Sequence, residues 1–298
     1  MWNYSSKIKP FVKWVGGKSR VIDQLLPLFP QKFDTYVEPF LGGGSVLFHL
    51  EPNSCNIFAS DINNELVNTY RLIQSNHFSK DLPILYNILD FFSYLYSKDF
   101  YYYIRNKSWD SSEEGANLLI IARFLFLNKT GYNGLYRVNS KKEFNVPFGK
   151  KKECPKLYDK ENIENIEKFI RSWNSCNNFF IIKQTCRKFL DFILTATDMN
   201  CVPILTKDAF VYCDPPYDDA YNQYSKNAFK HEDQVFLYEK MKEFDQKGIK
   251  FAVSNKATDF ILNLYKEYNI HFIETTKQIS CKTESRSSKF KEVLITNY

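Results

Sequence analysis

Apolar positions follow two alternating patterns along the chain, and each pattern predicts a different element. Short apolar runs bounded by turn residues predict strands, and apolar residues three or four positions apart predict helices. The predicted strands are 36–37, 56–60, 179–182, 210–213, 249–254, 270–275 and 292–297. The predicted helices are 21–28, a helix beginning near 46–50, several between 65 and 130, one from about 160, 234–244 and 260–268. Strand and helix alternation at both ends favours an α/β fold with a largely parallel sheet.

A long helical stretch interrupts this alternation after the second predicted strand. We therefore expect residues 65–175 to form a separate lobe, and residues 1–64 and 176–298 to form the α/β domain. Within the lobe, residues 130–152 contain Gly131 and an Asn-Gly pair around two short β-like segments. These turn signals predict a β-hairpin with an elaborated loop.

The net charge gathers in and after this hairpin. Residues 137–160 carry eight basic and three acidic side chains, a net charge of +5 in a chain whose total is +6. A solvated basic loop is one interpretation. A nucleic-acid surface is the other, since arginine can hydrogen bond guanine twice and lysines neutralise phosphates.

The run 210–213 ends in the sequence Asp214-Pro215-Pro216-Tyr217. Two consecutive prolines cannot continue a sheet, so the chain leaves the strand in a fixed direction. A conjugated amino group is a poor nucleophile. The Asp214 side chain and the Pro215 carbonyl could accept its two hydrogens and localise its lone pair, and Tyr217 could stack on the ring. We expect methyl transfer to such an amine, governed mainly by positioning and electrostatics. The polar stretch 218–231 that follows is a candidate flap over the site.

A glycine-rich turn at 42–45 follows Glu38-Pro39-Phe40 at the end of a predicted strand. Such a turn lets backbone amides approach a nucleotide-like ligand. Asp61 comes nineteen positions after Gly42, at the end of the next predicted strand. It could hold a ribose, or it could cap the next helix. The turn differs from the G-x-G-x-x-G pattern of dinucleotide-binding proteins. This difference argues against a dinucleotide and favours another adenosine cofactor.

Composition indicates a globular protein, with 44% hydrophobic residues and no run long enough to span a bilayer. Seven cysteines without C-x-x-C spacing predict buried free thiols rather than disulfides or a metal site. The first residues contain no apolar signal core. We expect a cytoplasmic protein without a membrane partner.

Six motifs occur in one order. They are Phe-Val-Lys-Trp-x-Gly-Gly-Lys (11–18), Glu-Pro-Phe-x-Gly-Gly-Gly (38–44), Asp61, Tyr-Asn-Gly-Leu-Tyr-Arg (132–137), Phe-Asn-Val-Pro-Phe-Gly (144–149) and Asp-Pro-Pro-Tyr (214–217). In this order the chain resembles the Dam-type DNA adenine N6-methyltransferases over nearly its whole length. The resemblance implies a Rossmann-like S-adenosylmethionine-dependent methyltransferase sheet with an inserted helical and β-hairpin DNA-recognition lobe. It also implies double-stranded DNA as the partner and a flipped-out adenine, usually within GATC, as the target.

The resemblance assigns roles to motif residues. Trp14, Lys18, Asp61 and Asp214 would contact the cofactor, together with the strand-end and turn residues Glu38, Phe40, Gly42 and Gly43. Catalysis would use Asp214, Pro215 and Tyr217. DNA contacts are expected from Lys13, Tyr132, Asn133, Leu135, Arg137, Asn139, Asn145, Pro147 and Lys150.

Among the DNA contacts, Lys13 and Arg137 would meet guanines, and Leu135 and Pro147 a thymine methyl group. Asn133 would pair with the orphaned thymine, and Tyr132 would wedge into the stack.

The chain departs from the family pattern in two places. Lys151 stands where relatives often have tyrosine, and the expected cofactor-adenine strand reads Thr-Cys-Arg-Lys-Phe at 185–189. We expect a monomer, with a dimer and a companion restriction endonuclease also compatible with the sequence. The alternatives are another adenine-containing DNA site, an RNA, a protein glutamine amide, or a DNA-binding module without catalysis. Asp214 argues against the amide, for which related enzymes tend to carry Asn.

Overall fold

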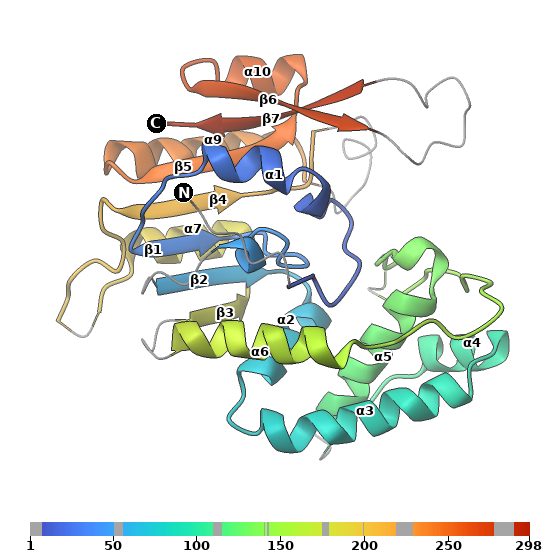
Figure 1. Ribbon diagram of the computed structural model, residues 1–298. Coiled ribbons are helices and arrows are strands. Elements are labelled where there is room, and N and C mark those ends of the chain that lie inside the picture. The colour runs from blue at the N-terminus through green and yellow to red at the C-terminus, as the bar shows by residue number, and fades with distance from the viewer. Residues whose placement is uncertain are drawn as a thin grey trace.

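The computed structural model describes residues 8–50, 56–109, 115–139, 141, 143–174, 179–198, 200–218, 229–276 and 289–298. Its centre is a seven-stranded sheet with the order β3-β2-β1-β4-β5-β7-β6 (Figure 1). The strands are β1 (Thr35–Glu38), β2 (Asn56–Asp61), β3 (Phe179–Lys183), β4 (Ala209–Cys213), β5 (Lys250–Lys256), β6 (Asn269–Thr276) and β7 (Lys289–Thr296). Strands β1 to β5 pair in parallel, and β7 is antiparallel to β5 and β6. The predicted α/β class with a largely parallel sheet is confirmed.

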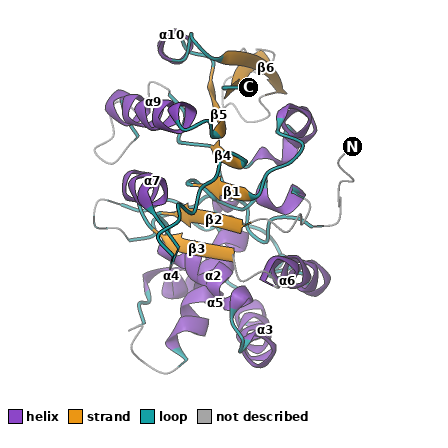
Figure 2. Cartoon of the chain, turned by 90° about the vertical axis from the view of Figure 1, so that its left-hand side faces the viewer, coloured by secondary structure: helices purple, strands orange, loops and turns teal. Residues whose placement is uncertain are grey.

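The sheet is covered on both faces, which explains why its strands are apolar runs. In β4, Phe210 and Tyr212 enter one core, while Val211 and Cys213 enter the other. Helices α7 and α9 lie on one face and α6 on the opposite face (Figure 2). The helices are α1 (Ile22–Leu25), α2 (Asn64–Gln74), α3 (Phe78–Tyr94), α4 (Lys98–Asn106), α5 (Ala116–Thr130), α6 (Lys160–Asn174), α7 (Cys186–Thr195), α9 (His231–Gln246) and α10 (Asp259–Leu264).

Helices α3, α4 and α5 lie past the edge strand β3, away from the rest of the sheet (Figure 1). Helix α5 carries buried residues on most of its circumference, including Ile121, Ala122 and the run 124–127. A helix that is apolar nearly all round belongs in a core. Helix α5 is therefore the centre of this helical group.

The helix predicted to begin near 46–50 is wrong. The segment forms a single 3-10 turn, η3 (Leu47–His49), and Leu50 is already extended. Val46, Leu47, Phe48 and Leu50 are all buried, and His49 is the one partly exposed residue of this segment. Pro52 follows closely, and the residue before a proline avoids the helical region.

The expected strand at 185–189 is also wrong. Strand β3 ends at Lys183, and Thr185 caps α7 by accepting a hydrogen bond from the Lys188 amide at 3.4 Å. Residues 186–189 form the first turn of that helix because the Thr185 hydroxyl satisfies an amide that an isolated helix end leaves open.

The hairpin between 130 and 152 is held by isolated antiparallel bridges instead of regular strands. The bridges join Gly131 to Phe148 and Val138 to Phe144. Between them the chain makes a 3-10 turn, η4 (Tyr132–Gly134), in which Asn133 has a positive φ of 55°. The predicted two β-like segments are therefore short bridges around a tight turn.

Four cysteines fall in the described residues, and all are free thiols. Cys213 is buried as expected, but Cys201 is exposed and Cys154 and Cys186 are half-buried. The described residues contain no cluster of three or more potential metal ligands. None of the helices in the described part of the chain has the length and apolar character of a membrane span. Most of the predicted flap, at 219–228, lies outside the described residues.

Candidate active site

The Asp214–Tyr217 turn starts at the carboxyl end of β4, near the middle of the sheet. Strand order reverses between β1 and β4, so the chain winds outward in opposite directions from this pair. Such a reversal leaves a crevice at the carboxyl ends of the strands, where ligands bind in open α/β sheets. Glu38 ends β1 and Asp214 follows β4, so both stand at this crevice.

Two buried amide side chains hold the turn in place. The Gln234 side chain of α9 donates to the Pro216 carbonyl at 3.0 Å and accepts from the Asn255 side chain at 3.0 Å. The Asn255 side-chain oxygen accepts from the Asp218 amide at 3.1 Å. Gln234 and Asn255 are both fully buried, so the turn is bonded from α9 and β5 together. We did not predict either residue from the sequence, where the single cue is an amide at the end of the apolar strand β5.

Lys18 forms an ion pair with Asp214 across 196 sequence positions. Its Nζ lies 2.6 Å from Asp214 Oδ2 and also donates to the Gly16 carbonyl at 2.8 Å. Burial raises the pKa of Asp214, and the Lys18 charge and hydrogen bond lower it in opposition. The side chains of Lys18 and Asp214 are only 5% and 18% exposed, so water screens the pair weakly.

Tyr217 is oriented by contacts at two points of its side chain. Its hydroxyl donates to Glu292 Oε2 of β7 at 2.8 Å, and Lys18 Nζ lies 4.8 Å from its ring centroid. Burial raises the pKa of Tyr217 well above its ordinary value, and the charges of Asp214 and Glu292 raise it further. The phenol therefore stays neutral and donates. We did not predict Glu292 from the sequence, because nothing near it in the chain marks it.

The glycine turn is closed by Asp61. One carboxylate oxygen accepts from the Gly42 amide at 2.9 Å and the other from the Asn63 amide at 2.8 Å. The side chain of Asn63 caps α2 by accepting from the Leu66 amide. The alternative role of Asp61, as the helix cap, is therefore wrong. Burial raises the pKa of Asp61, and the backbone hydrogen bonds lower it in part.

Trp14 packs directly on this turn. A Cβ atom at Gly42 would lie 2.7 Å from Trp14 Cδ1, and one at Gly43 would lie 3.2 Å from Trp14 Cβ. On its other side, the indole contacts Tyr136 of the hairpin at a centroid distance of 5.5 Å. Trp14 therefore links the glycine turn to the hairpin.

Glu38 stands between the Asp214 turn and Asp61 of the glycine turn, and both of these carboxylates act on it. It is 2% exposed and accepts a hydrogen bond from Tyr36 at 3.0 Å. Burial raises the pKa of Glu38 well above its ordinary value, and the Asp214 and Asp61 charges raise it further. Phe40, two positions later, packs edge-on against Phe229.

Asn128 joins the N-terminal segment to the hairpin. Its side chain accepts from the Lys13 amide at 3.0 Å and donates to the carbonyls of Lys13 at 2.8 Å and Gly134 at 3.2 Å. Asn128 is 1% exposed, so these contacts satisfy its buried amide. They place the exposed Lys13 beside Gly134 of the hairpin, where a Cβ atom would lie 2.7 Å from Lys13 Cδ. Asn128 has no motif spacing to reveal it in the sequence.

Arg137 and Asn145 face each other across the hairpin. Arg137 Nε donates to the Asn145 side-chain oxygen at 2.8 Å, and Nη2 donates to the Asn145 carbonyl at 3.3 Å. Asn139 is held in a similar way by Glu143, to which its side chain donates at 2.8 Å. The remaining predicted DNA contacts divide into exposed Tyr132, Pro147 and Lys150, and half-buried Leu135.

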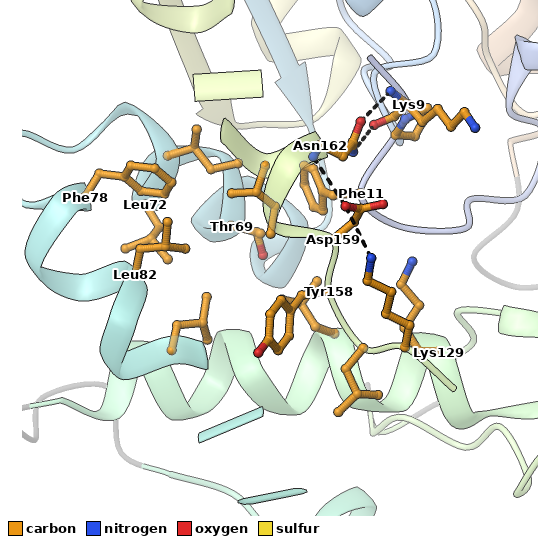
Figure 3. Close-up of a pocket in the computed structure, with 17 residues that line it drawn as sticks. Lys9, Phe11, Thr69, Leu72, Phe78, Leu82, Lys129, Tyr158, Asp159 and Asn162 are labelled. Carbon is orange, nitrogen blue, oxygen red and sulfur yellow. Dashed lines mark hydrogen bonds and ion pairs between the residues drawn. The ribbon is translucent and has the colours of Figure 1, made fainter. Parts of the chain in front are cut away.

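A cavity of about 230 Å³ lies away from the Asp214 turn, between the N-terminal segment and helices α2, α3, α5 and α6. Figure 3 shows its apolar wall, which includes Phe11, Leu72 and Phe78. Lys9 and Asn162 close one side through a reciprocal pair of hydrogen bonds. No residue of the crevice lines this cavity.

Comparison with known proteins places this geometry in a family. Residues 14–279 match the model of the D12 class of N6 adenine-specific DNA methyltransferases. The chain is 35% identical to the type II methyltransferase M1.LlaDCHI of Lactococcus lactis subsp. cremoris, covering 98% of this chain and 96% of that protein. It is 33% identical to the type II methyltransferase M.MjaIII of Methanocaldococcus jannaschii, covering 98% and 100%.

A third relative is the DNA adenine methylase of Haemophilus influenzae, 31% identical over 97% of this chain and 93% of that protein. The family match spans both the glycine turn and the Asp214 turn, and the relatives align over almost their full lengths. This chain is a member of the D12 class of N6 adenine-specific DNA methyltransferases.

Proposed function

We propose that this enzyme transfers a methyl group from S-adenosylmethionine to N6 of an adenine flipped out of duplex DNA, within GATC. The observation that carries the proposal is the Asp214 turn, fixed at the sheet's switch point, with Lys18 paired to Asp214 and lying over the Tyr217 ring. Adenine-specific methylation is the activity of the family to which the chain belongs. The cofactor, the flipping step and the GATC site are the proposed parts.

The crevice suits a cofactor without phosphates. The Gly42 amide, which a phosphate would use at such a turn, already donates to Asp61. Trp14, Lys18, Glu38, Phe40, Gly42, Gly43, Asp61 and Asp214 are the residues proposed to hold the cofactor. Carboxylates at Asp61 and Asp214 favour a cationic ligand, and S-adenosylmethionine supplies a methyl group on a positively charged sulfur.

The Asp214 carboxylate and the Pro215 carbonyl are proposed to accept the two N6 hydrogens of the target adenine. The two oxygens come from adjacent residues on a turn that Gln234 and Asn255 hold, so little freedom is lost when the base binds. Tyr217 would stack on the base. Lys18 pairs with Asp214 and would keep the carboxylate ionised while the amine is held.

The hairpin and Lys13 are proposed to read the DNA. Asn145 holds the Arg137 guanidinium through Nε and Nη2, and the remaining N–H groups of the guanidinium could make a two-bond contact with guanine. Burial lowers the pKa of Lys129, and the nearby charges of Lys13 and Lys151 lower it further. Three lysines close enough to influence one another support a polyanionic partner.

The other proposed contacts follow from exposure and position. Tyr132, 52% exposed at the tip of η4, would enter the base stack, and the neighbouring Asn133 would pair with the orphaned thymine. Leu135 and Pro147 would contact a thymine methyl group, and Asn139, Asn145 and Lys150 would make the remaining DNA contacts. Residues 65–175 would form the recognition lobe, and 1–64 with 176–298 the catalytic domain.

The direct test is methyl incorporation from labelled S-adenosylmethionine. A duplex with one GATC site should be labelled at adenine, whereas a duplex of the same composition with the site scrambled, or an RNA of the same sequence, should not. Asp214→Ala should reduce transfer at least about 100-fold, since it removes an acceptor aimed at the reacting group. Its affinity for the duplex should stay close to that of the wild type. Equal labelling of the two duplexes would refute the GATC proposal, and labelling of RNA alone would refute duplex DNA as the substrate.

A companion restriction endonuclease and a monomeric enzyme complete the proposal. The first is supported by two relatives named type II methyltransferases. Protection of GATC-containing DNA from a GATC-cleaving nuclease after methylation, and a monomeric mass in gel filtration, are the expected results.

A further inference from the structure

We propose that Glu292 is a positioning residue for methyl transfer, which holds and polarises Tyr217 against the target adenine. The inference rests on the proposed function, in which Tyr217 stacks on a flipped base. It adds a carboxylate from strand β7 to those of Glu38, Asp61 and Asp214.

The geometry at Glu292 is well defined by the sheet. Glu292 lies on β7, opposite Lys256 of β5 and Ile273 of β6. From there its Oε2 accepts the Tyr217 hydroxyl at 2.8 Å. This bond fixes the far end of the phenol, while the backbone of the Asp214 turn fixes its near end. With both ends held, the ring has one available orientation, and a base stacked on it is oriented in turn.

A carboxylate is a costly choice of acceptor at this position. The Glu292 charge raises the pKa of Asp214, so the two carboxylates repel each other across the crevice. Elsewhere in the sheet a neutral partner suffices: the buried Tyr212 hydroxyl shares a hydrogen bond with the Ser254 hydroxyl at 2.9 Å. Packing alone therefore does not require a charged partner for Tyr217.

The charge has a use in the reaction. A phenol that donates to an anion becomes richer in electrons, and an aromatic face rich in electrons attracts positive charge. The Lys18 ammonium already lies 4.8 Å from the centre of this ring. During transfer the N6–C bond forms as the carbon–sulfur bond breaks and leaves its electron pair on sulfur. Positive charge moves onto the base until N6 releases a proton to the Asp214 carboxylate that accepts its hydrogen bond. A Tyr217 ring polarised by Glu292 would stabilise that charge while it is stacked on the adenine.

The test compares Glu292→Gln, Tyr217→Phe and the double variant in single-turnover methylation of a GATC duplex. A hydrogen bond to a charged group corresponds to a loss of about 10- to 100-fold in rate for each single variant. The double variant should be no slower than the slower single variant, because Glu292→Gln removes the charge of the acceptor and Tyr217→Phe removes the donor of the same contact. Dissociation constants for DNA and S-adenosylmethionine should change less than about threefold.

A fluorescent base provides a readout that a purely structural role would not move. With 2-aminopurine in place of the target adenine, the wild type should hold the flipped base stacked and quenched. Glu292→Gln should leave that base brighter, because a neutral acceptor holds the ring beneath it less firmly than a carboxylate does. The matched control is Glu267→Gln, which removes the charge from the acceptor of the Tyr238 hydroxyl, a tyrosine–glutamate hydrogen bond exposed to solvent in the same domain. It should leave both the rate and the fluorescence unchanged.

Three results would overturn the inference. They are an unchanged rate in Glu292→Gln, losses that multiply in the double variant, and a defect confined to DNA affinity. If Glu292→Gln proves unstable in urea unfolding, Tyr217→Phe still measures the bond, and a wild-type rate in that variant contradicts the proposal. Failure of the wild-type enzyme to methylate adenine in the duplex would instead refute the proposed function.

Discussion

Replacing Lys18 by methionine should destabilise the protein strongly near neutral pH and much less in acid. The variant keeps the aliphatic stem but leaves the Asp214 carboxylate without its cation. At 2.6 Å and an effective dielectric of about 20, the attraction between the two charges is about 6 kcal/mol. Desolvation offsets part of this attraction, so the expected loss in the free energy of unfolding is about 3–5 kcal/mol.

The pH dependence follows from the pKa of Asp214, which burial raises and Lys18 lowers. A carboxyl group whose pKa is higher in the folded state contributes stability at low pH and loses it as the pH rises through the folded pKa. Without Lys18 that pKa rises further. The variant's deficit should therefore be large at about pH 8 and smaller at about pH 5, because a lower pH favours the protonated, neutral form of Asp214.

Urea unfolding of the wild type, Lys18→Met and the double variant Lys18→Met/Asp214→Asn at both pH values checks this reasoning. The double variant should recover most of the lost stability at high pH, because no unpaired charge remains. A deficit of equal size at both pH values, or a double variant no more stable than the single one, would show that the ion pair is not the cause.

Three further experiments test other parts of the site. Gly44→Ala should lower the free energy of unfolding by about 2–3 kcal/mol in thermal unfolding, since the residue has a φ of +70° and its Cβ would lie 2.6 Å from a buried tyrosine hydroxyl. Gly115→Ala, with a φ of +77° and open space around the added Cβ, measures the backbone strain alone and should lower the free energy of unfolding by only about 1–2 kcal/mol. Arg137→Ala should lose about 1–3 kcal/mol of discrimination at one base pair, measured as kcat/KM on duplexes with one substituted base pair. Asn145→Ala should lose part of that discrimination, because Asn145 holds the guanidinium. Equal discrimination in the wild type and both variants would refute the assignment of Arg137. Gln234→Leu leaves two buried hydrogen-bonding partners unsatisfied, so urea unfolding should show a free energy of unfolding lower by about 2–4 kcal/mol. Its kcat should fall more than its cofactor affinity, and an unchanged kcat would contradict the role of Gln234 in holding the turn.

Local patterns predicted most of the elements because their signals lie within a few residues. The apolar runs at 210–213 and 249–254 became β4 and β5, and the helical pattern at 234–244 became α9. Where the pattern failed, a local interaction that periodicity does not measure prevailed. The chain is already extended at Leu50, two residues before Pro52, so 46–50 holds one 3-10 turn, and Thr185 began a helix where a strand was expected.

The chain alone determined the chemistry that the turns can offer: a carboxylate held by two prolines after a buried strand, glycines where backbone must pack closely, and a basic hairpin. Only the tertiary structure decided which side chains complete them. Asp214 meets Lys18 across 196 positions, Lys13 is held by Asn128 across 115, and Tyr217 donates to Glu292 across 75. No periodicity relates residues in separate elements. Their meeting is decided by the strand order and by the packing of helices on the sheet, which follow from burial summed over the whole chain.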